Sequence, residues 1–441
     1  MDKKIIIGAG VIVVAGGFVA HGLAGKSADQ QIRQSLAALE AGEDIAVSQV
    51  QTHKGLGKTS LTAHLTAVDA PALSGDLAMD VGYLSRKADG SLTFSGDVLE
   101  GVVDFTTGLG RGKRHYTFSA DELSAAKYDV TLEQTEGSGY VDAEKEHFAL
   151  NMQTRRIGFQ DASSNLQVNG LHAAFEHTLD AQQGEGRSHA RVMLEGAGLT
   201  VDQGAQSLEA FSLGATELHN TATLDGETLT SQLYFSADDA VYLDSEPGEI
   251  ELDVTTDGLN YAAIEAVSSA LERSLDALDS DKTLTPQRQQ ALERELQDTL
   301  VEETHTLLAH SPALQLNTLD VDAALPMLGR LTAELSGSLA FDGDGLAQDA
   351  TNALLATLDA DTQRLIMAKG RPTLSAGEAQ AEFASRVSGE VTLGELPERL
   401  VAQLPPAFQA LLINGEAPHT FAWENGQLLY NGEPLERALA Q

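Results

Sequence analysis

The sequence predicts an α+β protein dominated by a long antiparallel β-sheet, with one αα-hairpin and one N-terminal transmembrane helix. Three observations support this prediction: an apolar run near the N-terminus, alternation of apolar and polar residues over much of the chain, and two helical stripes of apolar residues. Of the 441 residues, 42% are hydrophobic, which suffices for an extended core. We expect the sheet to be elongated or curled rather than a compact sandwich.

Residues 1–26 are predicted to form a short cytoplasmic tip and a transmembrane anchor. The uncharged run from Ile5 to Gly25 would span about 30 Å as a helix, which matches the hydrocarbon core of a bilayer. Lys3 and Lys4 precede this run, so we expect a cytoplasmic N-terminus and a body on the outer side of the membrane. The side chains expected to contact lipid are Ile5, Ile6, Ile7, Val11, Ile12, Val13, Val14, Phe18 and Val19.

A cleaved signal peptide is the alternative to an anchor, with Gly22-Leu23-Ala24 as its cleavage site. The apolar part of the run, from Ile5 to Ala20, is long for a signal peptide, which favours the uncleaved anchor. Small residues in the run leave open whether two anchors associate and form a homodimer.

Charge and cysteine content exclude several classes of function. Acidic residues outnumber basic ones by 65 to 28, giving a formal net charge of −37. Such a surface repels nucleic acids, whose binding depends on Lys and Arg, and it also repels anionic lipid headgroups. The chain has no cysteine, so disulfides, thiolate catalysis and cysteine-ligated metals are excluded.

Residues 27–44 are predicted to form a helical stalk. Ile32, Leu36 and Leu39 share one helical face, and Gly42 is a suitable end. Residues 45–258 change to a β-rich region, in which segments such as 60–68 alternate with a period of two. Turns between strands are expected at Asp89-Gly90, Asn169-Gly170 and Asp225-Gly226.

Residues 259–312 are predicted to form an αα-hairpin. Ile264, Val267 and Leu271 lie on one stripe of the first helix. The second helix is expected to begin at Thr285-Pro286 and to end before Ser311-Pro312.

Residues 313–441 are predicted to contain strands, a helix and a closing hairpin. The expected elements are strands near 313–322 and 330–342, a segment at 345–366 that is ambiguous between helix and other structure, a strand at 382–393, a helix at 395–412 that is broken or bent at Pro405-Pro406, and a hairpin turning at Asn425-Gly426.

The stretch THKGLGKTSL, residues 52–61, contains part of the phosphate-binding loop motif. That motif needs a glycine five residues before Gly57, where this chain has Thr52, and a helix after Lys58, where this chain alternates like a strand. We therefore predict a hairpin turn here and no nucleotide site.

Two further groups of residues have side chains of the kinds that bind metals, but their spacing does not match a known metal site. His305 and His310 are five residues apart, which turns them about 140° apart on a helix. Asp342, Asp344 and Asp349 resemble a calcium loop, except that Leu346 occupies a ligand position. We predict histidines that are solvated or locally bonded, a plain turn, and no metal or cofactor.

The two ends of the body resemble the YdgA-like family, a Gram-negative domain of unknown function numbered 945. The resembling features are Lys3-Lys4 with the anchor, the turn His53-Lys54-Gly55, and the ending FAWENGQLLYNGEPL at residues 421–435. Gly57 departs from the family pattern, which has an aromatic residue there. The resemblance implies an inner-membrane anchor with a periplasmic body, and it carries over no catalytic residues.

These features predict a non-enzymatic protein of the cell envelope. The leading hypothesis is that a curled sheet with an apolar concave face handles lipid or another apolar envelope component. The alternative is a periplasmic scaffold or chaperone-like protein that docks on an envelope protein through the αα-hairpin or a sheet edge. An apolar groove wide enough for a chain would favour the first, and a face filled by the protein's own side chains would favour the second.

Overall fold

The computed structural model describes residues 45–438 with short gaps in the loops. The gaps are 56–57, 68–72, 83–86, 96–97, 109–112, 126–128, 143–146, 161–162, 181–183, 204–205, 244, 281–285, 326–328, 359, 398–400, 403, 416 and 425. The anchor residues, Lys3, Lys4 and the stalk lie outside the described residues. None of the helices in the described part of the chain is both long and apolar enough to cross a membrane.

The fold is mostly antiparallel β-sheet with few helices, as predicted. The chain divides into two compact units. Unit 1 comprises residues up to 180, 187–219 and 237–248, and unit 2 comprises 181–186, 220–236 and 249–441. Each unit is described separately below.

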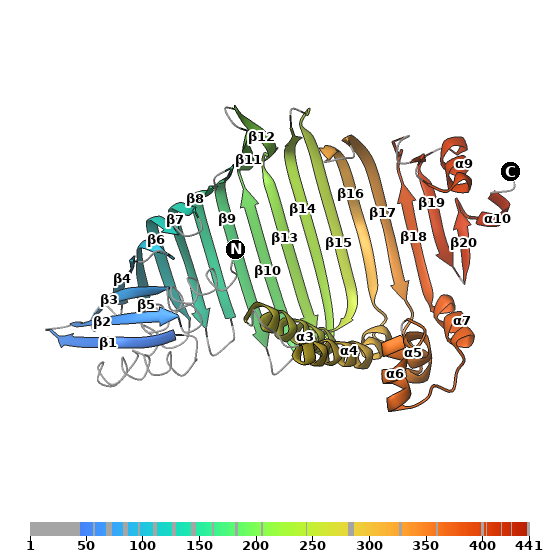
Figure 1. The fold of residues 1–441 in the computed structure, drawn as a ribbon, viewed down its shortest axis with the longest axis horizontal. Helices are drawn as coiled ribbons and strands as arrows, with labels where there is room; N and C mark the ends of the chain where they lie inside the picture. Colours follow the sequence, from blue (N-terminus) through green and yellow to red (C-terminus); the bar gives the residue numbers. More distant parts are fainter. Residues whose placement is uncertain are drawn as a thin grey trace. The chain divides into compact units, whose positions relative to one another are not determined.

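Unit 1 is built on a meander in which each strand pairs with the next (Figure 1). The far edge of β9 pairs with β11, which in turn pairs with β12. The strands are β1 (Ile45–Lys54), β2 (Lys58–Ala67), β3 (Ser74–Gly82), β4 (Lys87–Ser95), β5 (Glu100–Gly108), β6 (Arg114–Ala125), β7 (Val130–Asp142), β8 (His147–Gln160), β9 (Ser164–Asp180), β10 (Glu185–Leu194), β11 (Gly196–Gln203) and β12 (Gln206–Leu213).

The core of unit 1 lies on one face of β2–β6. Alternate residues of each strand point to this face, which produces the period-two pattern in the sequence. Leu65 is fully buried and Phe94 is 2% exposed. Phe105 and Phe118 are partly buried and pack against this cluster. Over these strands the apolar face is therefore filled by the protein's own side chains.

Unit 2 contains a second antiparallel ladder that carries all the helices described. Its elements, of which the first three strands also have residues in unit 1, are β13 (Thr216–Asp225), β14 (Thr228–Tyr242), β15 (Gly248–Asn260), α3 (Tyr261–Ser280), α4 (Pro286–Ala309), β16 (Ala313–Leu325), β17 (Gly329–Phe341), α5 (Gln348–Leu355), α6 (Ala360–Lys369), α7 (Ala376–Arg386), β18 (Val387–Leu393), α9 (Pro406–Asn414), β19 (His419–Glu424), β20 (Gln427–Tyr430), β21 (Glu433–Pro434) and α10 (Leu435–Ala438).

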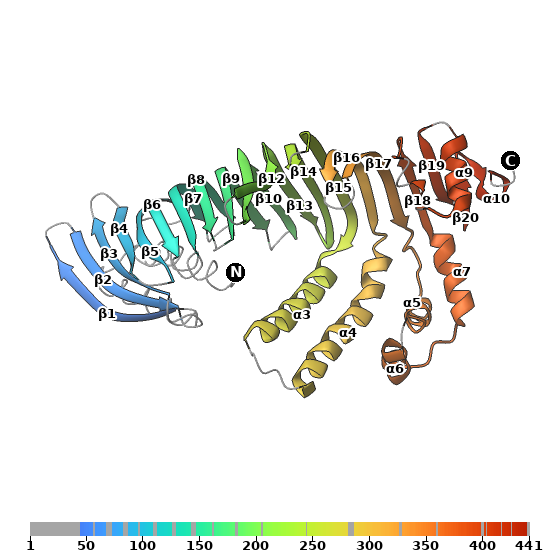
Figure 2. The same ribbon diagram turned by 45° about the horizontal axis from the view of Figure 1, so that its top comes forward.

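Helices α3 and α4 follow β15 and precede β16 in the chain. They lie side by side as an αα-hairpin (Figure 2). The Asn260 side chain caps the start of α3 by accepting a 2.9 Å hydrogen bond from the Ala263 amide. An ion pair of 2.9 Å joins Arg273 of α3 to Glu295 of α4. A small second core forms where Phe341 of β17 meets α4, α5 and α7.

Two of the expected turns are wrong. Asp89-Gly90 lies inside β4, and Asn169-Gly170 lies inside β9. A β-carbon on Gly90 would lie 2.7 Å from the Phe105 ring, so this glycine permits close packing within the sheet. Gly170 has a φ of +58°, which interrupts β9 without ending it. Asp225-Gly226 does join β13 to β14, as expected.

Two expected elements near the C-terminus also differ in their bounds. The strand expected at 382–393 begins only at Val387, because the preceding residues form α7. A reciprocal capping box between Ser375 and Glu378 starts that helix. The helix expected at 395–412 is broken before the proline pair, as the sequence allowed: Val401 is helical, and the second part, α9, begins at Pro406.

Candidate functional site

A trough of about 910 Å³ crosses strands β4–β10 of unit 1 and is the candidate site. Its position follows from the register of the meander. The four consecutive strands β5–β8 place one residue each in a line across the sheet: Phe105, Phe118, Gly137 and Met152. Phe105 and Phe118 pack against the core, so their neighbours along each strand point to the other face.

That other face carries two rows of polar side chains that line the trough. One row runs through Thr106, Thr117, Ser138 and Asn151, and the second runs through Asp104, Ser119, Glu136, Gln153 and His172. The residues between the rows, among them Phe105, Phe118 and Met152, also line the trough. The trough is therefore bounded by two polar rows with partly apolar residues between them.

The charges along the trough are predominantly negative. Asp89 accepts a 2.8 Å hydrogen bond from Thr106, and Glu136 accepts one from Gln153. Within the described chain, neither of these carboxylates nor Asp104 forms a salt bridge. The trough's arginine, Arg191, is paired with a glutamate of β13 at 2.7 Å. The trough thus carries three carboxylates without a cationic partner.

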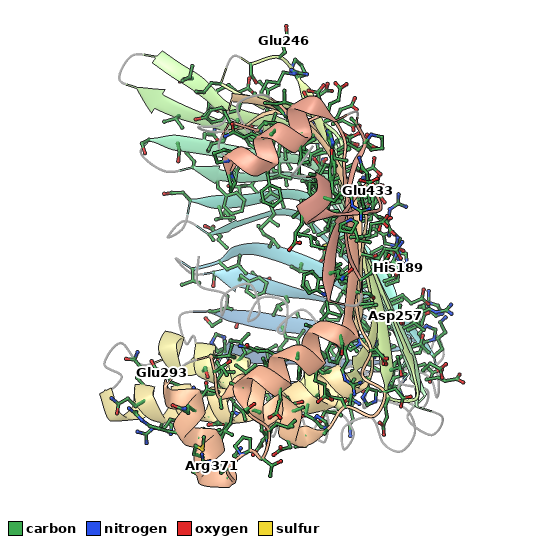
Figure 3. The ribbon with its side chains drawn as sticks, turned by 90° about the vertical axis from the view of Figure 1, so that its right-hand side faces the viewer. His189, Glu246, Asp257, Glu293, Arg371 and Glu433 are labelled. Carbon is green, nitrogen blue, oxygen red and sulfur yellow. The ribbon has the colours of Figure 1, made fainter. Side chains whose placement is uncertain are left out.

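A hydrogen-bonded network of three side chains lies on β7–β9. The Tyr140 hydroxyl lies 2.6 Å from His147 Nε2 and donates a 2.9 Å hydrogen bond to Glu176. His147 Nε2 is also 2.9 Å from Glu176 Oε1. Hydrogen bonds from His147 and then Tyr140, with the charge of His147 and of His189 (labelled in Figure 3), lower the pKa of Glu176. The carboxylate is therefore held in its charged form.

The stretch that resembles a phosphate-binding loop forms the β1–β2 hairpin, as predicted. The Gly55 amide donates to the Lys58 carbonyl at 2.9 Å, which closes the turn. Lys58 pairs with Asp80 of β3 at 2.7 Å, and Ser60 donates to the same carboxylate. Hydrogen bonds from Lys58 and Ser60 lower the pKa of Asp80. Lys58 is thus engaged within the sheet.

The two helical histidines are locally bonded, as predicted. His305 Nδ1 lies 3.1 Å from the Thr351 hydroxyl, and burial lowers the pKa of His305. His310 bonds to the Thr306 carbonyl at 3.0 Å and lies 3.1 Å from the Asn260 amide nitrogen. Both rings therefore connect α4 to neighbouring elements.

The calcium-like segment is a plain turn, as predicted. The Asp344 amide donates to the Asp342 carboxylate at 3.1 Å. Arg386 donates to the carbonyls of Asp342 and Asp344 at 3.1 and 2.7 Å, so a guanidinium satisfies these oxygens. Asp349 accepts hydrogen bonds from the Thr373 and Leu374 amides. Over the described parts of the chain, no three His, Asp or Glu side chains are placed to hold a metal.

The sequence analysis did not identify the trough. A signal for it exists, because consecutive strands carry polar residues two apart near their centres. These are Thr117 and Ser119, Glu136 and Ser138, and Asn151 and Gln153. Such pairs become a site only when the register aligns them, and residue spacing alone does not fix the register.

A separate apolar surface occurs on β16–β18 of unit 2. Leu314 lies opposite Leu339, and these side chains are 44% and 53% exposed. Val391 is 41% exposed and lies opposite Gly337, where a β-carbon would contact the Val391 side chain. These three residues, called the leucine patch below, share one face of the ladder.

Comparison with known proteins gives one match. The family model described as bacterial protein of unknown function (DUF945) matches residues 56–368. No curated protein and no solved structure matches the chain. The matched range begins after His53-Lys54-Gly55 and ends before residues 421–435, so it lies between the features on which the resemblance was based. It covers most of the chain, and the protein therefore belongs to this bacterial family of unknown function, DUF945.

Proposed function

We propose that the protein is anchored in the inner membrane, has no catalytic role, and binds another component of the cell envelope in its trough. The observation that carries this proposal is the trough's polar lining. The side chains of Ser119, Ser138 and Asn151 are exposed and form no hydrogen bond within the described chain. Their donors and acceptors are available to a partner. The expected anchor at residues 5–25 would hold the body at the periplasmic surface of that membrane.

The shape of the trough supports binding of an elongated partner. Its lining residues come from seven neighbouring strands. The nearby pair His147 and Glu176 is bonded to itself and to Tyr140, so it is held in place by its own partners. This interaction role corresponds to the scaffold hypothesis, but it uses a sheet face instead of the αα-hairpin or an edge.

Site-specific photocrosslinking in cells would test the proposal. A photoreactive residue replaces Ser138 in the trough of the full-length chain, and the control replaces Ser338, which is exposed on β17. We expect one discrete adduct from position 138, which disappears when Asp104→Asn and Glu136→Gln are added. Equal adducts from both positions, or none from position 138, would contradict a binding role for the trough.

Lipid handling is a second candidate, and the leucine patch favours it. Exposed Leu314, Leu339 and Val391 could contact an acyl chain. Mass spectrometry of residues 27–441, produced in the periplasm and purified without detergent, would test this role. We expect stoichiometric lipid that is lost in Leu339→Gln and retained in Leu233→Gln, a variant of an exposed leucine on β14. A lipid-free protein would refute it.

A further inference from the structure

We infer that the trough binds an extended, basic segment of a partner protein in the polyproline II conformation. This inference rests on the proposed function and specifies the partner. Three properties of the trough support it: its dimensions, the spacing of its carboxylates, and the hydrogen-bonding groups between them.

The dimensions fit a single polypeptide chain. Seven strands about 4.8 Å apart give the trough a length of about 29 Å. Its volume of about 910 Å³ then corresponds to a mean cross-section of about 31 Å². A polyproline II segment rises about 3.1 Å per residue, so nine residues extend about 28 Å.

The charges select a basic segment with a defined spacing. Asp104 and Glu136 lie in one row with Ser119 between them, so their strands are two spacings, about 9.6 Å, apart. In polyproline II every third side chain lies on the same side, about 9.3 Å from the last. Lysine or arginine at every third position would therefore meet these two carboxylates, and Asp89 of β4 adds a third carboxylate in the other row, opposite Thr106.

The remaining lining groups suit an exposed peptide backbone. A polyproline II segment makes no internal hydrogen bonds, so its carbonyl oxygens need donors from the partner. Asn151, Ser138 and Thr117 provide amide and hydroxyl donors along the first row, which lies beside the row of Asp104 and Glu136. Sugar rings commonly need an aromatic platform, and Phe105 and Phe118 line the trough, but both rings are partly buried against the core. These features favour a peptide over a glycan.

Fluorescence anisotropy with the full-length protein tests this inference. The probe is a fluorescein-labelled nonapeptide of three Lys-Pro-Pro repeats at about 50 mM salt. A second nonapeptide has the same composition, but its three lysines are adjacent. The test variant is Asp104→Asn with Glu136→Gln. The matched control is Asp320→Asn with Glu251→Gln. It removes the same number of negative charges from two exposed residues that lie opposite each other on β16 and β15.

We expect the trough variant to weaken binding of the repeat peptide by about twofold to thirtyfold, as for two ion pairs of about 0.2–1 kcal/mol each. The matched control should stay within twofold of the unmodified protein. The peptide with adjacent lysines should bind at least threefold more weakly than the repeat peptide. Circular dichroism confirms that each variant is folded.

Equal weakening in both double variants would overturn the inference, because it would mean that the net charge of −37 attracts the peptide without a site. Equal binding of the two peptides would overturn the polyproline II spacing. A crosslinked adduct from position 138 without peptide binding would leave the proposed function standing and exclude a basic partner. Peptide binding without that adduct would contradict the proposed function in cells.

Discussion

Gly139 of β7 should not tolerate even one added methyl group. A β-carbon at this position would lie 2.6 Å from Tyr116 Cζ and closer still to the carbonyl oxygen of Ala149 on β8. Tyr116 cannot swing away freely, because its hydroxyl donates a 3.0 Å hydrogen bond to that same oxygen. Burial also raises the pKa of Tyr116 to about 12, so this phenol remains a donor at neutral pH. The substitution Gly139→Ala must therefore force β7 and β8 apart.

The expected loss of stability in Gly139→Ala follows from two destabilising effects and one stabilising effect. Overpacking costs about 1–3 kcal/mol, and a weakened buried hydrogen bond costs about 0.5–1.5 kcal/mol. Replacing glycine reduces the entropy of the unfolded chain, which returns about 0.4–1 kcal/mol. We expect Gly139→Ala to lower the free energy of local unfolding by about 2–3 kcal/mol.

Hydrogen exchange measured by mass spectrometry on peptides from residues 130–160 is the assay. A loss of 2–3 kcal/mol should accelerate exchange there about 30-fold to 160-fold. The control is Gly158→Ala on β8, where an added β-carbon meets nothing within 4 Å. That variant should exchange at the same rate as the unmodified protein or more slowly. Similar acceleration in both variants would refute the steric argument.

Three further predictions concern stability in other parts of the chain. Phe94→Ala should cost about 3–5 kcal/mol in urea unfolding, because this side chain is 2% exposed, and a cost below about 1 kcal/mol would show that the core is assigned wrongly. Arg386→Lys should cost about 1–2 kcal/mol in thermal unfolding, since lysine cannot reach both carbonyls of the 342–344 turn, and an unchanged melting temperature would contradict this. The pKa of Asp80 is lowered on folding, so its pair with Lys58 stabilises the protein above the unfolded pKa near 4 and is lost as pH falls through the lower folded value. Acid titration should therefore show a smaller loss of stability below pH 4 in Asp80→Asn, and an unchanged acid profile would argue against the pair.

Local patterns in the sequence predicted the helices and strands themselves better than they predicted which of these elements contact one another. The alternation in β2 and the start of α4 at Pro286 follow from residues a few positions apart, and both were predicted. Asp89-Gly90 was mistaken for a turn because a glycine beside an aspartate occurs both in turns and in sheets. In this protein it makes room for Phe105, which is fifteen positions further along the chain.

The trough could not be predicted for a related reason. Asp104 and Glu136 are separated by 32 positions, and they share a row only because β5, β6 and β7 pair in one specific register. A shift of one residue in either pair would place one of these side chains on the core face. The alternation shows which residues share a face of one strand, but only the paired structure shows which strands align them.

The polar lining of the trough also determines how strongly it can bind. Exposed ion pairs contribute about 0.2–1 kcal/mol each, and physiological salt limits attraction to within about 8 Å. A few carboxylates would therefore hold a free peptide weakly and release it quickly. The proposed anchor changes this result, because two proteins held at one membrane surface meet at an effective concentration in the millimolar range. A site that is weak in solution is then largely occupied at the membrane. Removing Asp104 and Glu136 should consequently reduce occupancy less between two anchored proteins than between the protein and a soluble peptide.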